Sequence, residues 1–308
     1  MRLVDASMEV TMESTHLRYD PAARFDVAFR DVEYRRVGDR ALLAHVYEPQ
    51  GPGPFPMLID IHGGGWNRFD RLRDKPVDAM LATHGIFIAS LDFRLNGEAP
   101  HPAAMQDINY AIRWFKAHAA DFNARPEGMG GLGFSSGGHQ ILMAGMRPTY
   151  PTYVAEDGPA GVDASLSYVI CSGCGFDLIT AMTERAPTEP HDHDFFHLYD
   201  YFGRVGGVKS ESPQHILESG ETIARPAVLL LQAGGDVLPG FTTDKAVKFA
   251  QTYADGGGYI DLVIFPGAPH IFINPGLVER SEAMDRGLSA VRSYIANQLA
   301  YMAAPHSK

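Results

Sequence analysis

The sequence predicts an α/β fold in which a mostly parallel sheet is covered by helices on both faces. Short, nearly continuous apolar runs recur along the chain, as is typical of strands that are buried on both faces. Segments with apolar residues at helical spacing separate several of these runs, which favours the α/β class. Polar residues with catalytic potential follow the runs directly, where the carboxyl ends of parallel strands would gather them.

The elements follow one another in a regular order. The expected strands cover residues 41–47, 55–61, 85–91, 130–134, 168–171, 227–233 and 260–265. One helical stripe comprises Met105, Ile108, Ala111, Ile112 and Phe115, and a second comprises Met284, Leu288, Val291, Ile295 and Leu299. Each stripe predicts a helix that packs one face on the sheet.

Two segments depart from this alternation. Residues 1–30 are polar and weakly periodic, which fits a short helical extension or a part of a cap. Residues from about 176 to 223 contain no convincing core strand and are rich in His, Asp and aromatic side chains. Long irregular insertions in compact domains are usually functional. We therefore expect a single domain over residues 1–308, with an N-terminal extension and a lid insertion.

Composition narrows the classes of protein. The 308 residues are 45% hydrophobic and 20% charged, which are ordinary values for a soluble domain with a real core. The formal net charge of −11 disfavours nucleic acid as a partner. No apolar signal region opens the chain, and no apolar run is long enough to span a membrane. With only two cysteines, we expect a reducing, cytoplasmic setting.

The strongest single motif is Gly133-Phe134-Ser135-Ser136-Gly137, which matches G-x-S-x-G. A serine on a sharp strand-to-helix turn needs small neighbours, and the turn lifts its hydroxyl into a cleft. A glycine-rich turn without catalytic function would give the same pattern. Other residues must therefore support Ser135 as a nucleophile.

A second motif, His62-Gly63-Gly64-Gly65-Trp66, follows the apolar run at 55–61 directly. Three glycines would let backbone amides approach a developing oxyanion without obstruction by side chains, and such donors contribute a few kcal/mol each. A flexible turn after a strand is the alternative interpretation.

The segments HGGGW at 62–66, LDFRL at 91–95 and GFSSGGH at 133–139 resemble a known family. They are similar to the esterase branch of the α/β-hydrolase superfamily that includes hormone-sensitive-lipase-like enzymes and acetyl and feruloyl esterase-like proteins. The resemblance covers roughly residue 31 to the C-terminus. It implies the α/β-hydrolase fold, with a central sheet of about eight strands and a lid insertion.

The resemblance also implies an oxyanion hole made by the backbone amides of Gly64, Gly65 and Ser136. The family often has Ala where this chain has Ser136, a change that a backbone donor tolerates. It often has Tyr where this chain has Phe93, between Asp92 and Arg94. We expect Asp92 and Arg94 to be structural.

The other two triad members should follow the serine in the order acid, then histidine. Asp236 lies just beyond the apolar run at 227–233, after two glycines. Asp244 and Asp261 are alternatives, although the first looks like a helix-start residue and the second lies in a strand pattern. His270 follows the last expected strand, where the family has its catalytic histidine.

These residues predict a serine carboxylesterase that forms an acyl-enzyme on Ser135 and needs no metal or cofactor. Its partner would be a small to medium, partly apolar ester. An amidase or formamidase with the same triad is the main alternative. A non-catalytic binding protein, a lyase or a haloperoxidase on the same fold is a weaker one.

Weaker signals remain. Cys171 and Cys174 are spaced C-x-x-C, but core packing fits them better than redox chemistry. The acidic, histidine-rich run at 191–197 suggests a polar lid helix rather than a metal site. We expect the substrate pocket to be lined by Trp66, Phe195, Phe196 and Tyr199. The resemblance leaves monomer or homodimer open.

Overall fold

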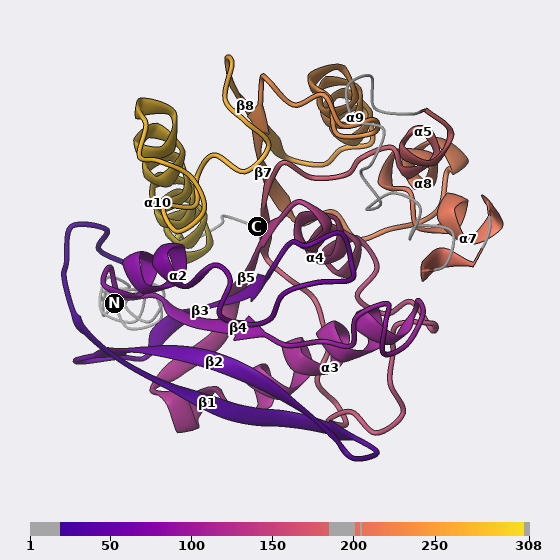
Figure 1. The fold of residues 1–308 in the computed structure, drawn as a ribbon. Helices are drawn as coiled ribbons and strands as arrows, with labels where there is room; N and C mark the ends of the chain where they lie inside the picture. Colours follow the sequence, from indigo (N-terminus) through magenta and orange to yellow (C-terminus); the bar gives the residue numbers. More distant parts are fainter. Residues whose placement is uncertain (1–18, 185–200, 204, 305–308) are drawn as a thin grey trace, which may run out of the picture.

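The computed structural model describes residues 19–184, 201–203 and 205–304. An eight-stranded sheet forms its centre, in the order β1-β2-β4-β3-β5-β6-β7-β8 (Figure 1). The β1–β2 and β2–β4 pairs are antiparallel, and the other five pairs are parallel. The predicted α/β fold with a mostly parallel sheet of about eight strands is therefore confirmed.

The bounds of the elements agree closely with the sequence pattern. The strands are β1 (Asp26–Val37), β2 (Arg40–Gln50), β3 (Phe55–Ile61), β4 (Phe87–Leu91), β5 (Ala124–Phe134), β6 (Tyr168–Ser172), β7 (Ala227–Ala233) and β8 (Ile260–Phe265). The helices are α2 (Lys75–Ala82), α3 (Ala103–Ala117), α4 (Ser136–Met146), α5 (Leu178–Thr183), α7 (Val205–Ser210), α8 (Pro213–Ser219), α9 (Thr243–Asp255) and α10 (Glu282–Ala303), with a 3₁₀ turn η1 (Ala119–Phe122). The fifth strand begins at Ala124 and not at residue 130, as the sequence suggested.

Strand β1 corrects the boundary of the N-terminal extension. It begins at Asp26, so residues 26–30 belong to the sheet and not to the extension predicted over 1–30. The strand lies at the edge of the sheet, and most of its side chains are exposed. A strand with little buried surface carries little apolar alternation, which explains why the pattern did not reveal it.

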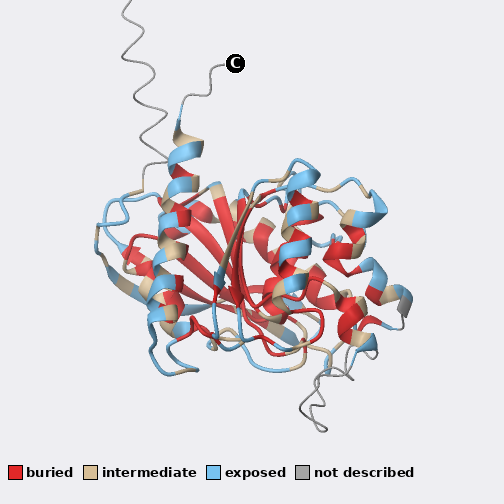
Figure 2. Ribbon diagram, turned by 90° about the horizontal axis from the view of Figure 1, so that it is seen from above, coloured by how far each residue is buried: buried red, intermediate tan, exposed pale blue. Residues whose placement is uncertain are grey.

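Two apolar layers lie on opposite faces of the sheet (Figure 2). Strand β3 contributes to both, because Met57 and Ile59 join one layer and Leu58 joins the other. The first layer packs against α3, α4 and α9, and the second packs against α2 and α10. The two predicted helical stripes thus form the inner faces of α3 and α10. Among the described residues, no helix combines the length and hydrophobicity that a bilayer crossing requires.

The described part of the predicted lid is helical. It contains α5, α7 and α8, while residues 185–200 and 204 lie outside the described residues. Asp177 caps α5, since its carboxylate accepts from the amide of Thr180 at 3.0 Å. The amides of Phe176 and Asp177 both donate to the carbonyl of Gly240. The insertion is therefore attached to the loop between β7 and α9, beside the carboxyl end of the sheet.

Candidate active site

Ser135 lies on a sharp turn between β5 and α4. Its backbone has φ 53° and ψ −121°, a left-handed conformation that is strained for a residue with a side chain. The close approach of the chain explains the flanking glycines. A Cβ atom on Gly137 would lie 2.0 Å from the carbonyl oxygen of Ile61. The amide of Ser135 donates to the carbonyl of Ser172, which ties the turn to the end of β6.

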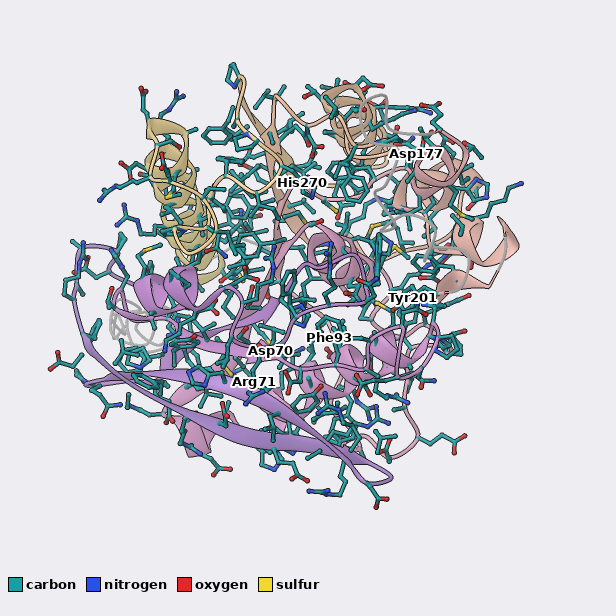
Figure 3. The ribbon with its side chains drawn as sticks, in the orientation of Figure 1. Asp70, Arg71, Phe93, Asp177, Tyr201 and His270 are labelled. Carbon is teal, nitrogen blue, oxygen red and sulfur yellow. The ribbon has the colours of Figure 1, made fainter. Side chains whose placement is uncertain are left out.

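Three side chains from three strand ends form a continuous hydrogen-bonded chain. The Nε2 atom of His270 lies 2.8 Å from Oγ of Ser135. The Nδ1 atom of His270 lies 2.5 Å from Oδ2 of Asp236. The Asp236 side chain is only 1% exposed, whereas the imidazole is 23% exposed and lies on the loop after β8 (Figure 3). The structure therefore brings together the three residues that the sequence predicted as a triad.

Backbone pairing between two loops holds the acid beside the histidine. The amide of Gly234 donates to the carbonyl of Phe265 at 2.8 Å, and the amide of Gly235 donates to the carbonyl of Ala268 at 3.0 Å. The other carboxylate oxygen of Asp236 accepts from the amide of Leu238 at 3.0 Å. One further contact was not predicted from the sequence: the ring of Phe241 meets His270 edge-on at 5.6 Å.

The glycine loop after β3 lies against the serine turn. A Cβ atom on Gly63 would lie 3.2 Å from the Cβ atom of Ser135. Gly64 has φ 127°, and a Cβ atom there would lie 2.4 Å from the carbonyl oxygen of Arg68. Gly65 has φ 63°. This loop therefore needs glycine, and Gly64, Gly65 and Ser136 come from the two backbone segments that meet at Ser135.

A buried histidine supports the same loop. Burial lowers the pKa of His62 to about 4, so the ring is neutral near pH 7 and its Nδ1–H can donate to the carbonyl of Gly63 at 2.7 Å. The ring stacks on Phe93 with centroids 4.5 Å apart. His62 thus fixes the loop and stays uncharged next to it.

Comparisons with known proteins show the family of this chain. A family model described as BD-FAE matches residues 45–165. Carboxylic ester hydrolase LipN of Mycobacterium tuberculosis is 38% identical over 75% of this chain and 61% of LipN. Carboxylesterase NlhH of the same organism is 33% identical over 77% of this chain and 73% of NlhH. The chain belongs to the hormone-sensitive-lipase-like carboxylesterase branch of the α/β-hydrolase superfamily.

The share of the other protein's length that this chain matches differs between LipN and a solved esterase structure. The chain spans 61% of the length of LipN. The solved apo structure of Thermogutta terrifontis esterase 2 is similar with a TM-score of 0.69 at 20% identity, over 90% of this chain and 96% of that one. That likeness concerns the fold alone.

Of the four residues predicted to line the pocket, the structure describes only Trp66. Trp66 is only 4% exposed and packs against the rings of His139, Tyr201 and Phe202, with centroids 5.5, 6.2 and 5.7 Å away. Its ring therefore joins the glycine loop to the lid, and a role in lining the pocket stays a prediction. Phe195, Phe196 and Tyr199 lie outside the described residues.

The two alternative acids named from the sequence pair with residues other than His270. Asp244 is in the first turn of α9 and accepts from the hydroxyl of Thr242. Asp261 lies within β8 and accepts from the hydroxyl of Tyr259. Cys171 and Cys174 are free, buried thiols in the core. No group of metal-binding side chains occurs among the described residues, and the run at 191–197 lies outside them.

A buried glutamate links the lid to α4 and to the segment before α3. The carboxylate of Glu211, 2% exposed, accepts from the hydroxyl of Tyr153 and lies 3.3 Å from Nε2 of His101 and 3.7 Å from Nη1 of Arg147. Its backbone carbonyl accepts from Nε2 of His139 at 2.7 Å. Glu211 thus connects α4 and the segment before α3 to the lid.

We expect Glu211→Ala to lower the free energy of unfolding by about 3 to 5 kcal/mol, because it leaves buried polar partners unpaired. Urea unfolding of wild type and variant measures this difference. Glu218→Ala is the control, since the Glu218–Lys248 ion pair is half exposed and should contribute less than about 1 kcal/mol. Equal effects of the two substitutions would contradict the proposed role of the Glu211 contacts.

Three carboxylates are buried beneath α2. Asp60 on β3, Asp74 at the start of α2 and Asp78 within α2 are fully buried. Arg73 pairs with Asp74 at 2.7 Å, whereas both carboxylate oxygens of Asp78 lack a hydrogen-bond partner. Burial raises the pKa of Asp60 and Asp78 well above their usual range, and it raises the pKa of Asp74 to about 6.

This cluster should make stability depend on pH. The folded state holds the protons of these carboxyl groups more tightly than the unfolded state. The contribution of the cluster to stability is therefore greatest below a pH of about 4, and it is lost as the pH rises through 6 and above. We expect Asp78→Asn, which cannot ionise, to raise the free energy of unfolding by about 1 to 2 kcal/mol at pH 8 and by less at pH 5. Urea unfolding at both pH values measures this. The exposed Asp39→Asn should follow the wild-type profile, and a pH profile of Asp78→Asn parallel to wild type would refute the explanation.

Proposed function

We propose that the protein is a serine carboxylesterase in which Ser135 is the nucleophile. The observation that carries the proposal is the chain Ser135–His270–Asp236, with 2.8 Å between serine and histidine and 2.5 Å between histidine and aspartate. Membership of a family whose relatives are named carboxylic ester hydrolase and carboxylesterase supports it.

The first half of the reaction follows from these contacts. His270 accepts the Ser135 proton on Nε2 while Oγ attacks the ester carbonyl carbon. Asp236 accepts from Nδ1–H, which keeps Nε2 free to take the proton and stabilises the imidazolium. The 2.8 Å distance between Oγ of Ser135 and Nε2 of His270 and the burial of the Asp236 side chain support this assignment.

The remaining steps use His270 again, together with backbone amides. The amides of Gly64, Gly65 and Ser136 stabilise the oxyanion of the tetrahedral intermediate. His270 protonates the departing alcohol, which leaves an acyl group on Ser135. His270 then deprotonates a water molecule that attacks the acyl carbonyl, and the carboxylic acid is released as Ser135 regains its proton. The proposed chemistry uses neither a metal nor a cofactor.

The proposed substrate is a small to medium, partly apolar ester. The aromatic cluster of Trp66, Tyr201 and Phe202 joins the glycine loop to the lid, and these apolar side chains beside the glycine loop support a partly apolar substrate. The names of the relatives favour an ester over the amide alternative. A cytoplasmic location and a homodimer stay predictions.

A two-part experiment tests the proposal. We expect a fluorophosphonate probe to label folded protein at Ser135, and mass spectrometry of the digested protein locates the label. We also expect hydrolysis of p-nitrophenyl acetate at least tenfold faster than that of an N-formyl arylamine. Absence of label at Ser135 would refute the nucleophile, and a preference for the formamide would assign the site to an amidase.

A further inference from the structure

A cavity of about 530 Å³ lies far from Ser135, at the opposite edge of the sheet. It is bordered by Phe55 at the start of β3, Arg125 at the start of β5, and Gly85 just before β4. These are the amino ends of parallel strands, whereas the triad lies at the carboxyl ends. The volume falls in the range of small-molecule sites, so the cavity is large enough to hold a small organic ligand.

Arg125 lines this cavity, and its guanidinium lacks a full set of hydrogen-bond partners. The residue is 5% exposed. Its Nη1 donates to the carbonyl of Pro54 at 3.0 Å, but Nε and Nη2 are both buried and have no hydrogen-bond partner. Leaving buried donors of a charged group unpaired is costly, and burial lowers the pKa of Arg125. Such a group calls for an anionic acceptor.

Other arginines of this protein show what the two free nitrogens can hold. Nε and Nη2 of Arg35 together grip Asp157 at 3.3 and 2.8 Å. The same pair on Arg36 grips Glu33 at 2.9 and 2.6 Å, and that on Arg71 grips Asp31 at 3.1 and 2.6 Å. Paired N–H groups of this kind match the two oxygens of a carboxylate. On Arg125 this fork has no such partner.

Two further donors accompany the fork. The hydroxyls of Tyr19 and Tyr168 are buried and lack hydrogen-bond partners, and Tyr168 interacts electrostatically with both Arg125 and Tyr19. Tyr19 lines the cavity itself, and burial raises its pKa to about 12, so the hydroxyl stays protonated and can donate.

The walls define the rest of the ligand. The rings of Phe25 and Phe55 meet edge-to-face at 5.1 Å, and three prolines complete the apolar lining. Among the lining residues, Arg125 is the one arginine or lysine, and the exposed carboxylate of Asp20 is also present. His84 is occupied, because its ring nitrogens contact the carbonyl of Met80 and the guanidinium of Arg292. The single unpaired guanidinium fork matches one carboxylate group, and the carboxylate of Asp20 disfavours a phosphate dianion.

We propose that this cavity is a binding site for a monocarboxylate carried on a small apolar body. Nε and Nη2 of Arg125 hold the two carboxylate oxygens, the hydroxyl of Tyr19 donates to one of them, and the apolar body lies against Phe25 and Phe55. The site lies at the amino ends of the parallel strands, away from the triad at their carboxyl ends. Binding of a ligand there does not depend on whether Ser135 is a nucleophile.

Calorimetric titration with benzoate tests the site. We expect saturable binding to the wild-type protein, at least tenfold weaker binding to Arg125→Lys, which keeps the charge but loses the fork, and about threefold weaker binding to Tyr19→Phe. Arg280→Lys is the matched control, because Arg280 is exposed and pairs with Asp285 elsewhere on the surface. It should bind benzoate as the wild type does.

A second measurement uses the wild-type protein alone and therefore does not depend on whether a variant folds. In the wild-type protein, the NMR signal of the Arg125 Nε–H should shift with added benzoate and saturate at the calorimetric affinity. No binding at 10 mM benzoate (a concentration of about twenty times a 0.5 mM Kd), equal affinity of Arg125→Lys and wild type, or an unmoved Arg125 signal would overturn the proposal. Inorganic phosphate binding as tightly as benzoate would overturn the assigned ligand class. Because these readouts measure binding alone, they are separate from the test of Ser135.

Discussion

Replacing Ser135 with alanine should lower the turnover of p-nitrophenyl acetate by about 10⁴-fold or more, because the substitution removes the attacking oxygen. Alanine keeps the Cβ atom, so the left-handed backbone at φ 53° carries the same strain in both proteins. The free energy of unfolding should therefore change by less than about 1 kcal/mol. Steady-state hydrolysis, together with urea unfolding of the same preparations, measures both quantities.

The exposed hydroxyl of Ser165 provides the matched control for this experiment. Its Oγ donates to Asp163 on the surface, well outside the hydrogen-bonded chain that ends at Asp236. Ser165→Ala should retain wild-type turnover. If Ser135→Ala kept more than a small fraction of activity, the reaction would use another nucleophile, and the interpretation of the turn after β5 would be wrong.

The contact between Ser135, His270 and Asp236 could be predicted from the sequence because these residues occupy local, recognisable positions. Ser135, Asp236 and His270 each follow an apolar strand, and parallel strands bring their carboxyl ends to one edge of a sheet. The glycines around Ser135 and in the loop after β3 follow from backbone contacts as short as 2.0 Å at Gly137. A constraint of that kind leaves a fixed pattern in the sequence.

The features that escaped prediction depend on contacts between distant segments. Asp60, Asp74 and Asp78 read as unremarkable polar residues, yet folding buries all three together. Arg125 lies outside the strand that the sequence predicted at 130–134, and only the packed structure reveals its unpartnered fork. Edge strand β1 was missed for a different reason, because it buries too little apolar surface to leave an alternating pattern.

The carboxylate of Asp236 sets the orientation of His270, so Asp236→Asn should lower turnover by about 10⁴-fold while changing KM little. One oxygen of Asp236 accepts from the amide of Leu238, and the other accepts from Nδ1–H of His270. An asparagine that keeps its oxygen on Leu238 turns its NH₂ group toward Nδ1. The imidazole then carries its proton on Nε2, which can no longer accept the Ser135 proton.

Asp244→Asn separates this explanation from a general effect of lost negative charge. Asp244 lies in the first turn of α9 and contacts Thr242, so its substitution should leave turnover within about twofold of wild type, as is usual for a surface residue with no catalytic contact. Burst kinetics with p-nitrophenyl acetate would show whether Asp236→Asn slows formation of the acyl-enzyme, the step that requires Nε2 as a base. Wild-type turnover in Asp236→Asn together with a large loss in Asp244→Asn would assign the acid to α9. Because His270 contacts Asp236 at 2.5 Å, that outcome would require the histidine to leave its observed position during the reaction.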